Sequence, residues 1–278
     1  MTQKLCFIGG GNMATSLIGG LLARNFSAAQ ITACDINPEP LAKLTEQFAI
    51  NTSTDSLSAV AEADIVMLAV KPQVMQVVCE QLSSSENKAE QLFISIAAGV
   101  READINRWLG GGRAVVRCMP NTPSLMQLGA TGLFANTQVS AAQKNTAQSI
   151  LDAVGITAWV DKEILLDAVT AVSGSGPAYF FYFIECLQAA GEKLGLDSDT
   201  ALALARQTAL GAASMAQQDD VVELRARVTS RKGTTEQAIL SFQKNGLDRL
   251  VEDATRAAYD RSGELALELG VSDQKSHK

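Results

Sequence analysis

Histidine is almost absent from this chain of 278 residues, since His277 near the end of the sequence is the only one. A mechanism that needs a buried histidine as its acid or base is therefore excluded. If the chain is an enzyme, its catalysis must rest on other groups and on the placement of its reactants.

Cysteines are few and scattered, and they form no Cys-x-x-Cys pair and no cluster with histidine. The five are Cys6, Cys34, Cys79, Cys118 and Cys186. Their odd number and wide spacing indicate neither a disulfide framework nor a zinc site, so we expect no bound metal. Reduced thiols are typical of a cytosolic protein.

Positive charge and long apolar runs are also lacking. Lys and Arg number 23 against 30 Asp and Glu, which gives a net charge of −7 at pH 7. An acidic surface repels phosphate backbones, so nucleic acid is not an expected partner. No apolar run approaches the length of a bilayer-spanning helix, and the short run from Leu5 ends in glycines without a signal-peptide cleavage pattern. We expect a soluble, cytoplasmic protein with no membrane segment.

The first part of the chain alternates short apolar strands with helical stretches. The predicted strands are residues 5–8, 31–34, 65–70, 92–96 and 114–118, and the predicted helices are 12–24, 40–48, 74–82 and 102–108. This alternation predicts a parallel sheet with right-handed crossovers. Residues 131–135 and 158–160 add strands that we expect to run antiparallel at the sheet edge. Residues 1–161 are therefore predicted to form a doubly wound α/β domain of the Rossmann type.

Residues 162–278 change to an almost wholly helical pattern that is rich in Ala and Leu. The predicted helices are residues 163–172, 178–193, 198–217, 235–244 and 247–269. Helices this rich in alanine rarely close a core alone within about a hundred residues. They either pack on the Rossmann domain or interdigitate with a second subunit, and we favour the second interpretation. The C-terminal part is thus predicted to be an all-α dimerisation domain.

A glycine fingerprint links the first predicted strand to the first helix. In Gly9-x-Gly11-x-x-Ala14, Gly9 permits the tight turn, Gly11 lets the backbone approach a pyrophosphate, and Ala14 allows close helix–sheet packing. A plain tight turn is the alternative, but the order strand, glycines, helix and second strand favours a dinucleotide site. Asn12 and Met13 belong to the same site.

An acidic residue, Asp35, ends the second predicted strand. A carboxylate there accepts hydrogen bonds from ribose hydroxyls and repels a 2′-phosphate, which favours NADH, although Asp35 could instead cap the next helix. Small or polar residues follow the other strands at the edge where such sheets bind ligands. The remaining cofactor residues that we predict are Ser56, Ala69, Val70, Lys71, Pro72, Ala97, Ala98 and Asn121.

Five stretches in this order carry a resemblance to a known family. They are residues 7–13, 69–72, 119–123, 173–179 and 233–235. Together they span essentially the whole chain, which closely resembles pyrroline-5-carboxylate reductases. The resemblance implies reduction of 1-pyrroline-5-carboxylate to L-proline with NADPH or NADH. It also implies a homodimer built through the C-terminal helices, often assembled further into a decamer.

The resemblance also implies roles for particular residues. Thr235 would be the catalytic residue that bonds the ring nitrogen, and the backbone N–H groups of Gly233, Thr234 and Thr235 would hold the carboxylate. Ser230 and Ser175 complete the implied substrate set. In the family the substrate lies between one subunit's nucleotide domain and the helices of its partner.

The residues themselves support a carboxylate site at Gly233–Thr235. They precede a helical pattern in which Thr234 and Gln237 have capping-box spacing, and a helix N-terminus attracts anions. An ordinary helix cap is the alternative. A cyclic imine can arrive protonated on nitrogen, so a site without histidine suits an imine better than a ketone.

The chain departs from the family where Ser230 is followed by Arg231 and Lys232, because Pro-Gly is usual there. Two cations could aid capture of the carboxylate, or they could face solvent and only change the stiffness of the loop. Arg227 also stands where relatives often carry Asn. The aromatic residues 179–183 favour core or interface packing over ligand binding.

Two other functions remain open at this point. A β-hydroxyacid dehydrogenase shares the two-domain plan, but it needs a lysine early in the first helix after the glycine-rich turn, and here none occurs between Gly176 and Lys193. The chain could also be a non-catalytic NAD(P)-binding redox sensor. The cap at 233–235 argues against the sensor without excluding it.

Overall fold

The computed structural model describes residues 3–84, 88 and 90–270. The chain forms two compact units, of which the first is Met1–Ser175 with Ala258–Lys278 and the second is Gly176–Ala257. The long helix α12 (Leu247–Gly270) begins in the second unit and ends in the first. The domain boundary predicted after residue 161 stays a prediction. The helix that follows this boundary, α7 (Leu165–Val169), contacts the sheet and is counted with the first unit.

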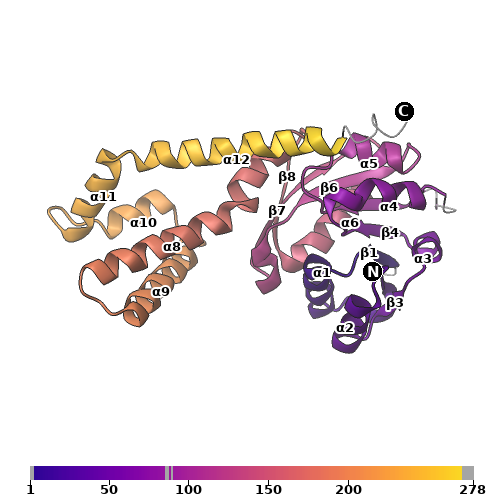
Figure 1. Cartoon of the computed structure of the whole chain (residues 1–278), viewed down its shortest axis with the longest axis horizontal. Coiled ribbons are helices and arrows are strands. Elements are labelled where there is room, and N and C mark those ends of the chain that lie inside the picture. The colour runs from indigo at the N-terminus through magenta and orange to yellow at the C-terminus, as the bar shows by residue number, and fades with distance from the viewer. Residues whose placement is uncertain (1–2, 85–87, 89, 271–278) are drawn as a thin grey trace. The chain divides into compact units, whose positions relative to one another are not determined.

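The first unit is built on one eight-stranded sheet with the order β3-β2-β1-β4-β5-β6-β7-β8 (Figure 1). The strands are β1 (Leu5–Ile8), β2 (Ile31–Cys34), β3 (Asn51–Ser53), β4 (Ile65–Leu68), β5 (Leu92–Ser95), β6 (Ala114–Met119), β7 (Gly129–Ala135) and β8 (Gly155–Trp159). β1 to β6 run parallel, β7 is antiparallel to β6, and β8 is parallel to β7. The order 3-2-1-4-5-6 is that of the Rossmann fold, so the predicted fold class and the antiparallel edge are confirmed.

Two sets of helices cover the two faces of this sheet, because its central strands β1, β4 and β5 are buried at every position. Leu5 and Phe7 of β1 belong to the core with α1, α2 and α6, whereas Cys6 and Ile8 belong to the core with α3, α4 and α5. The helices are α1 (Asn12–Ala23), α2 (Pro38–Phe48), α3 (Ser56–Glu62), α4 (Met75–Leu82), α5 (Glu102–Trp108) and α6 (Ala141–Leu151). The layers are therefore helix, sheet and helix.

The segment after β8 departs from its predicted form. The helix predicted over 163–172 is only α7, and it continues as a π-helical turn over Thr170–Gly174. The Cβ of a side chain at Gly174 would lie 2.7 Å from Met119 Cε, so this turn packs closely against the Met119 side chain at the end of β6. The wide turn ends at Ser175, whose N–H donates to the carbonyl of Thr170.

The second unit holds α8 (Gly176–Lys193), α9 (Ser198–Ala216), α10 (Val221–Arg227), α11 (Thr234–Lys244) and the first turns of α12. All of its residues are described, and only Gly176, Ala201 and Ala205 among them are buried. Phe180 is 71% exposed and Tyr182 is 68% exposed, so α8 leaves large aromatic surfaces uncovered. Large exposed aromatic side chains gathered on one helix are typical of an interaction face.

Two classes of feature are absent from the described part of the chain. No helix in it is long and apolar enough to cross a bilayer. No group of three His, Cys, Asp or Glu side chains in it could hold a metal ion.

Candidate functional site

The turn between β1 and α1 has the geometry that the glycine fingerprint requires. Gly9 has φ +106°, and a side chain there would come within 2.6 Å of the carbonyl oxygen of Ala69. The Gly9 N–H donates to Cys34 O at 2.7 Å, and the Ala69 N–H donates to Ile8 O at 2.8 Å. The turn therefore packs against the ends of β2 and β4, and only glycine fits at position 9.

The first turn of α1 is open toward solvent. Gly11 is the N-cap, no side chain bonds to the cap, and a Cβ built on Gly11 meets nothing within 4 Å. Ala14 is buried in the core beneath it. Asn12 and Met13 are the first residues of this uncapped helix, and their N–H groups have no partner within the helix, which fits a pyrophosphate approaching the helix N-terminus.

Asp35 does not cap α2, because Asn37 is the N-cap and its side chain accepts from Glu39 N. The Asp35 carboxylate instead turns back to the glycine turn. Its Oδ2 accepts from Gly10 N at 2.9 Å, and its Oδ1 accepts from Asn37 N at 2.9 Å. The sequence pattern did not indicate this bond, since it joins residues 25 positions apart.

The loop after β4 lies beside the glycine turn. Ala69 contacts Gly9, and Val70 Cγ1 lies 3.2 Å from the position that a Gly9 side chain would take. Lys71 is exposed and precedes the short 3-10 helix Pro72–Val74. Lys71 therefore follows the carboxyl end of β4, at the predicted cofactor edge of the sheet.

The remaining predicted cofactor residues are spread along the same edge. Ala97 is buried and Ala98 is exposed after β5, and Ser56 is the first residue of α3. Asn121 follows β6, but protein groups occupy its side chain, since its Nδ2 donates to Ser173 O and its Oδ1 accepts from Ala130 N. Asn121 thus holds the π-helical turn in place.

Ser230, Gly233, Thr234 and Thr235 belong to the other unit. α11 begins at Thr234 with Gly233 as its N-cap, and no side chain bonds to the cap. The predicted capping box of Thr234 and Gln237 is wrong, because Thr234 is already inside the helix. Glu236 Oε2 accepts from Lys232 N at 2.6 Å instead, and Gly233 N donates to Ser230 O. The first N–H groups of α11 stay available to an anion.

Comparison with known proteins identifies the chain. A pyrroline-5-carboxylate reductase of Pseudomonas aeruginosa is 56% identical over 271 residues, which cover 97% of this chain and 99% of that protein. One of Vibrio alginolyticus is 40% identical over 95% of this chain and 97% of that protein. The chain belongs to the pyrroline-5-carboxylate reductase family.

Family models and solved structures agree with membership in the pyrroline-5-carboxylate reductase family. The model for pyrroline-5-carboxylate reductase dimerisation matches residues 163–265, and the model for NADP oxidoreductase, coenzyme F420-dependent, matches residues 4–99. The structure of a Coxiella burnetii pyrroline-5-carboxylate reductase has a TM-score of 0.92 at 44% identity and covers 96% of this chain and 99% of its own. A Plasmodium falciparum pyrroline carboxylate reductase with NADP bound has a TM-score of 0.81 at 28% identity, over 95% of this chain and 98% of its own.

A 3-hydroxyisobutyrate dehydrogenase of Mycobacterium tuberculosis shares the fold alone, with 16% identity and a TM-score of 0.52. In this reductase-family chain α8 carries no lysine before Lys193. The dehydrogenase alternative therefore lacks its catalytic side chain here.

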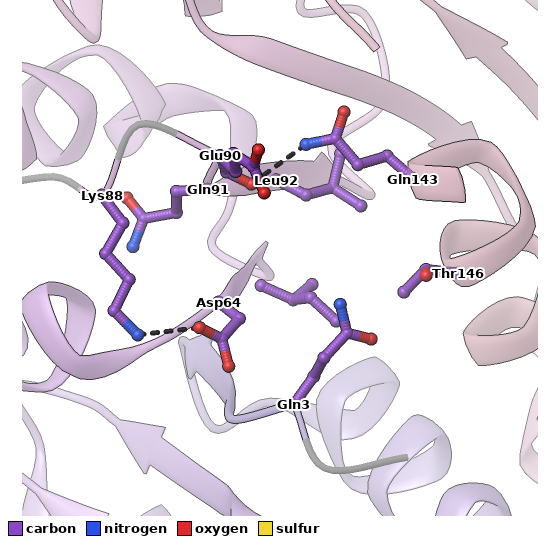
Figure 2. Close-up of a pocket in the computed structure, with 9 residues that line it drawn as sticks. Gln3, Asp64, Lys88, Glu90, Gln91, Leu92, Gln143 and Thr146 are labelled. Atoms are coloured by element: carbon purple, nitrogen blue, oxygen red, sulfur yellow. Dashed lines mark hydrogen bonds and ion pairs between the residues drawn. The ribbon is translucent and has the colours of Figure 1, made fainter. Parts of the chain in front are cut away.

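A polar cavity of about 520 Å³ lies at the amino edge of the sheet, away from the glycine turn. Gln3, Asp64 and Gln143 are among its lining residues, and Lys88 pairs with Asp64 at 2.7 Å (Figure 2). No residue predicted for the cofactor or substrate lines it, so it stays outside the candidate site.

The sequence analysis also missed a largely buried ionic network that is centred on Arg117 of β6. Arg117 is 4% exposed and pairs with Glu163 at 2.6 Å, and burial lowers the pKa of its guanidinium. Glu163 also accepts from Glu102 N at 2.6 Å. A lone arginine within the apolar strand Ala114–Met119 was the available signal, because a buried charge needs a partner.

Proposed function

We propose that this protein reduces 1-pyrroline-5-carboxylate to L-proline by hydride transfer from NADPH or NADH. The observation that carries the proposal is the full-length relation to pyrroline-5-carboxylate reductases at up to 56% identity. The glycine turn supports it, because Gly9 and Gly11 leave room for a dinucleotide where α1 begins.

The bound nicotinamide supplies a hydride to the imine carbon, and one proton completes the secondary amine. The chain holds the dinucleotide along the carboxyl edge of its sheet. In this proposal Gly9, Gly11, Asn12 and Met13 hold the pyrophosphate. The other residues that we propose contact the dinucleotide are Asp35, Ser56, Ala69, Val70, Lys71, Pro72, Ala97, Ala98 and the backbone at Asn121.

The first turn of α11 binds the substrate in this proposal. The N–H groups of Thr234 and Thr235 hold the carboxylate, and the uncapped start of the helix supports this role. The Gly233 N–H, which the family resemblance also implied, already donates to Ser230 O and is left out of this set. The Thr235 hydroxyl bonds the ring nitrogen and orients the imine, and Ser230 and Ser175 are the other substrate-binding residues of this proposal. Rate then comes chiefly from alignment of the imine with the hydride donor.

The family model for dimerisation over residues 163–265 supports a homo-oligomer. We propose a dimer through the C-terminal helices, with a decamer as a higher assembly. The acidic net charge argues against a nucleic-acid partner. We propose a cytoplasmic protein on the ground of its scattered cysteines, which indicate no disulfide framework.

Steady-state kinetics with 1-pyrroline-5-carboxylate and each cofactor test the function directly. We expect proline formation matched one to one by loss of reduced cofactor, and proline-dependent reduction of NAD⁺ at high pH. A redox sensor would bind the cofactor but show neither reaction.

A further inference from the structure

The π-helical turn over Thr170–Gly174 is held from outside its own helix by the side chain of Asn121. Asn121 follows β6, and its Nδ2 donates to Ser173 O at 3.0 Å while its Oδ1 accepts from Ala130 N at 2.9 Å. The residue is only 9% exposed. The Asn121 side chain therefore ties the π-helical turn to the start of β7, and both of its polar atoms are engaged by backbone groups.

The three hydroxyl groups of this segment differ in their partners. Thr170 Oγ1 donates to Leu166 O at 2.8 Å, and Ser173 Oγ donates to Val169 O at 3.0 Å. The hydroxyl of Ser175 has no hydrogen-bond partner among the described residues, and the residue is half-buried. Its backbone is fixed by the turn, since Ser175 N donates to Thr170 O at 2.8 Å. Ser175 therefore carries the hydroxyl that is left available to a ligand, and the turn decides where that hydroxyl lies.

We propose that the Asn121 side chain is a positioning group for the substrate, which acts by fixing the turn that carries Ser175 and makes no contact with the dinucleotide. The inference rests on the proposed function, in which Ser175 binds the imine. A π-helical turn is rare, and such turns are frequent at functional sites. Loss of the bond to Ser173 O releases the turn, and a misplacement of about 1 Å in a group that orients substrate can cost about a hundredfold in rate.

Asn121→Asp gives this role a signature in the pH profile. A protonated carboxyl at this position keeps both bonds, because its O–H donates to Ser173 O and its other oxygen accepts from Ala130 N. An ionised carboxylate has no donor and repels the carbonyl oxygen of Ser173. The activity of this variant relative to wild type should therefore recover as pH falls and the new carboxyl takes up a proton. Asn121→Leu has neither donor nor acceptor, so its loss should be the same at every pH.

Steady-state kinetics with 1-pyrroline-5-carboxylate are compared with the binding of NADH and NADPH, which is measured by fluorescence without substrate. At about pH 8, Asn121→Asp should lower kcat/KM for the imine about tenfold, raise the KM for the imine about threefold and leave both cofactor dissociation constants unchanged; at about pH 5.5 the loss in kcat/KM should shrink to about twofold. Asn136→Asp is the matched control, because Asn136 also bonds two backbone groups, Arg113 O at 2.9 Å and Val115 N at 3.2 Å. That control should lower the melting temperature without changing the KM for the imine.

Gly174→Val moves the same turn without changing Asn121, since its Cβ would lie 2.7 Å from Met119 Cε, and it decides the matter if the Asn121 variants fail to fold. It should raise the KM for the imine and leave cofactor binding unchanged, and an unchanged KM overturns the inference. An equal loss at both pH values in Asn121→Asp, or weaker cofactor binding with an unchanged KM for the imine, also overturns it. If the wild type forms no proline, the proposed function fails and this inference falls with it; if the wild type is active, these outcomes bear on the inference alone.

Discussion

The buried carboxylate of Asp167 accepts a hydrogen bond of 2.8 Å from Ser262 Oγ, although the two residues lie 95 positions apart. The same carboxylate pairs with Arg101 at 2.7 Å. Within the first unit, Asp167 of α7 therefore links α7 to Arg101, which precedes α5, and to Ser262 in the later turns of α12.

Asp167→Asn should destabilise the protein. The substitution leaves Arg101, whose side chain is 22% exposed, without its charge partner. Breaking a fully buried pair costs about 3–5 kcal/mol, and the partial exposure of Arg101 reduces the expected loss to about 2 kcal/mol. Urea unfolding at constant protein concentration measures it. Arg261→Gln, which breaks only exposed pairs with Glu264 and Glu268, should change little, and an equal loss in both variants would contradict the role of burial.

Gly11→Ala should weaken NADH binding more than tenfold without lowering the melting temperature. Its φ of −75° suits alanine and no protein atom obstructs the new methyl group, so the fold tolerates it. The methyl group would occupy the approach of the pyrophosphate. Gly263→Ala, in α12, is the control, because its Cβ also meets nothing within 4 Å. That control should leave NADH binding unchanged. Normal NADH binding by Gly11→Ala would contradict the proposal that the pyrophosphate lies at this turn.

Thr235→Ala should lower kcat/KM for 1-pyrroline-5-carboxylate more than tenfold, or about 1.4 kcal/mol. The loss follows from removing the hydroxyl that orients the ring nitrogen. Thr255→Ala is the matched control, since that hydroxyl bonds only to carbonyls of its own helix, at Val251 and Glu252. Unchanged kinetics in Thr235→Ala would take this residue out of the site.

Glu102→Gln should flatten the dependence of stability on pH just above pH 4.5. Burial, the largest cause, raises the pKa of Glu102 above its ordinary value of 4.5. The folded chain thus holds this proton more tightly than the unfolded chain, so this residue's contribution to stability is present below pH 4.5 and is lost as pH rises through the folded pKa. Thermal melting across pH 4 to 7 should show the variant gaining stability relative to wild type as pH rises. A constant difference between the two across this range would contradict the shift.

Phe180→Glu should shift the protein toward monomer. Phe180 is 71% exposed in α8, and we propose that a second subunit covers this helix, where a new charge would be costly to bury. Sedimentation velocity measures the change in mass. Gln138→Glu, an exposed position in the first unit, should sediment as wild type. Retention of the dimer by Phe180→Glu would place the interface elsewhere.

The apolar pattern predicted the central strands and helices well, because elements that are buried in the core are built from runs or periodic patterns of apolar residues. The strands at 5–8 and 31–34 and the helix at 102–108 have the predicted bounds. The missed elements are short or polar. β3 exposes Asn51 and Thr52, and α6 reads AAQKNTAQSIL, so neither shows a clear apolar period.

The sequence predicted which residues belong to the candidate site better than it predicted the contacts between them. Gly9 could be inferred because one backbone geometry requires glycine. The bond from Gly10 to Asp35 could not, since local spacing carries no information on which distant amide a carboxylate will face. The predicted capping box of Thr234 and Gln237 was wrong because the N-cap of α11 is Gly233, which has no side chain that could form such a box.

The course of α12 has a consequence for folding autonomy. One continuous helix supplies turns to both units, and its last residues pack beside Gly99, where Leu269 Cδ1 lies 3.2 Å from the position of a side chain on that glycine. A fragment that ended at residue 161 would keep the sheet but lose α7 and this covering helix. We therefore expect a nucleotide-binding half cut between β8 and α7 to be less stable than the same half carried together with the final helix.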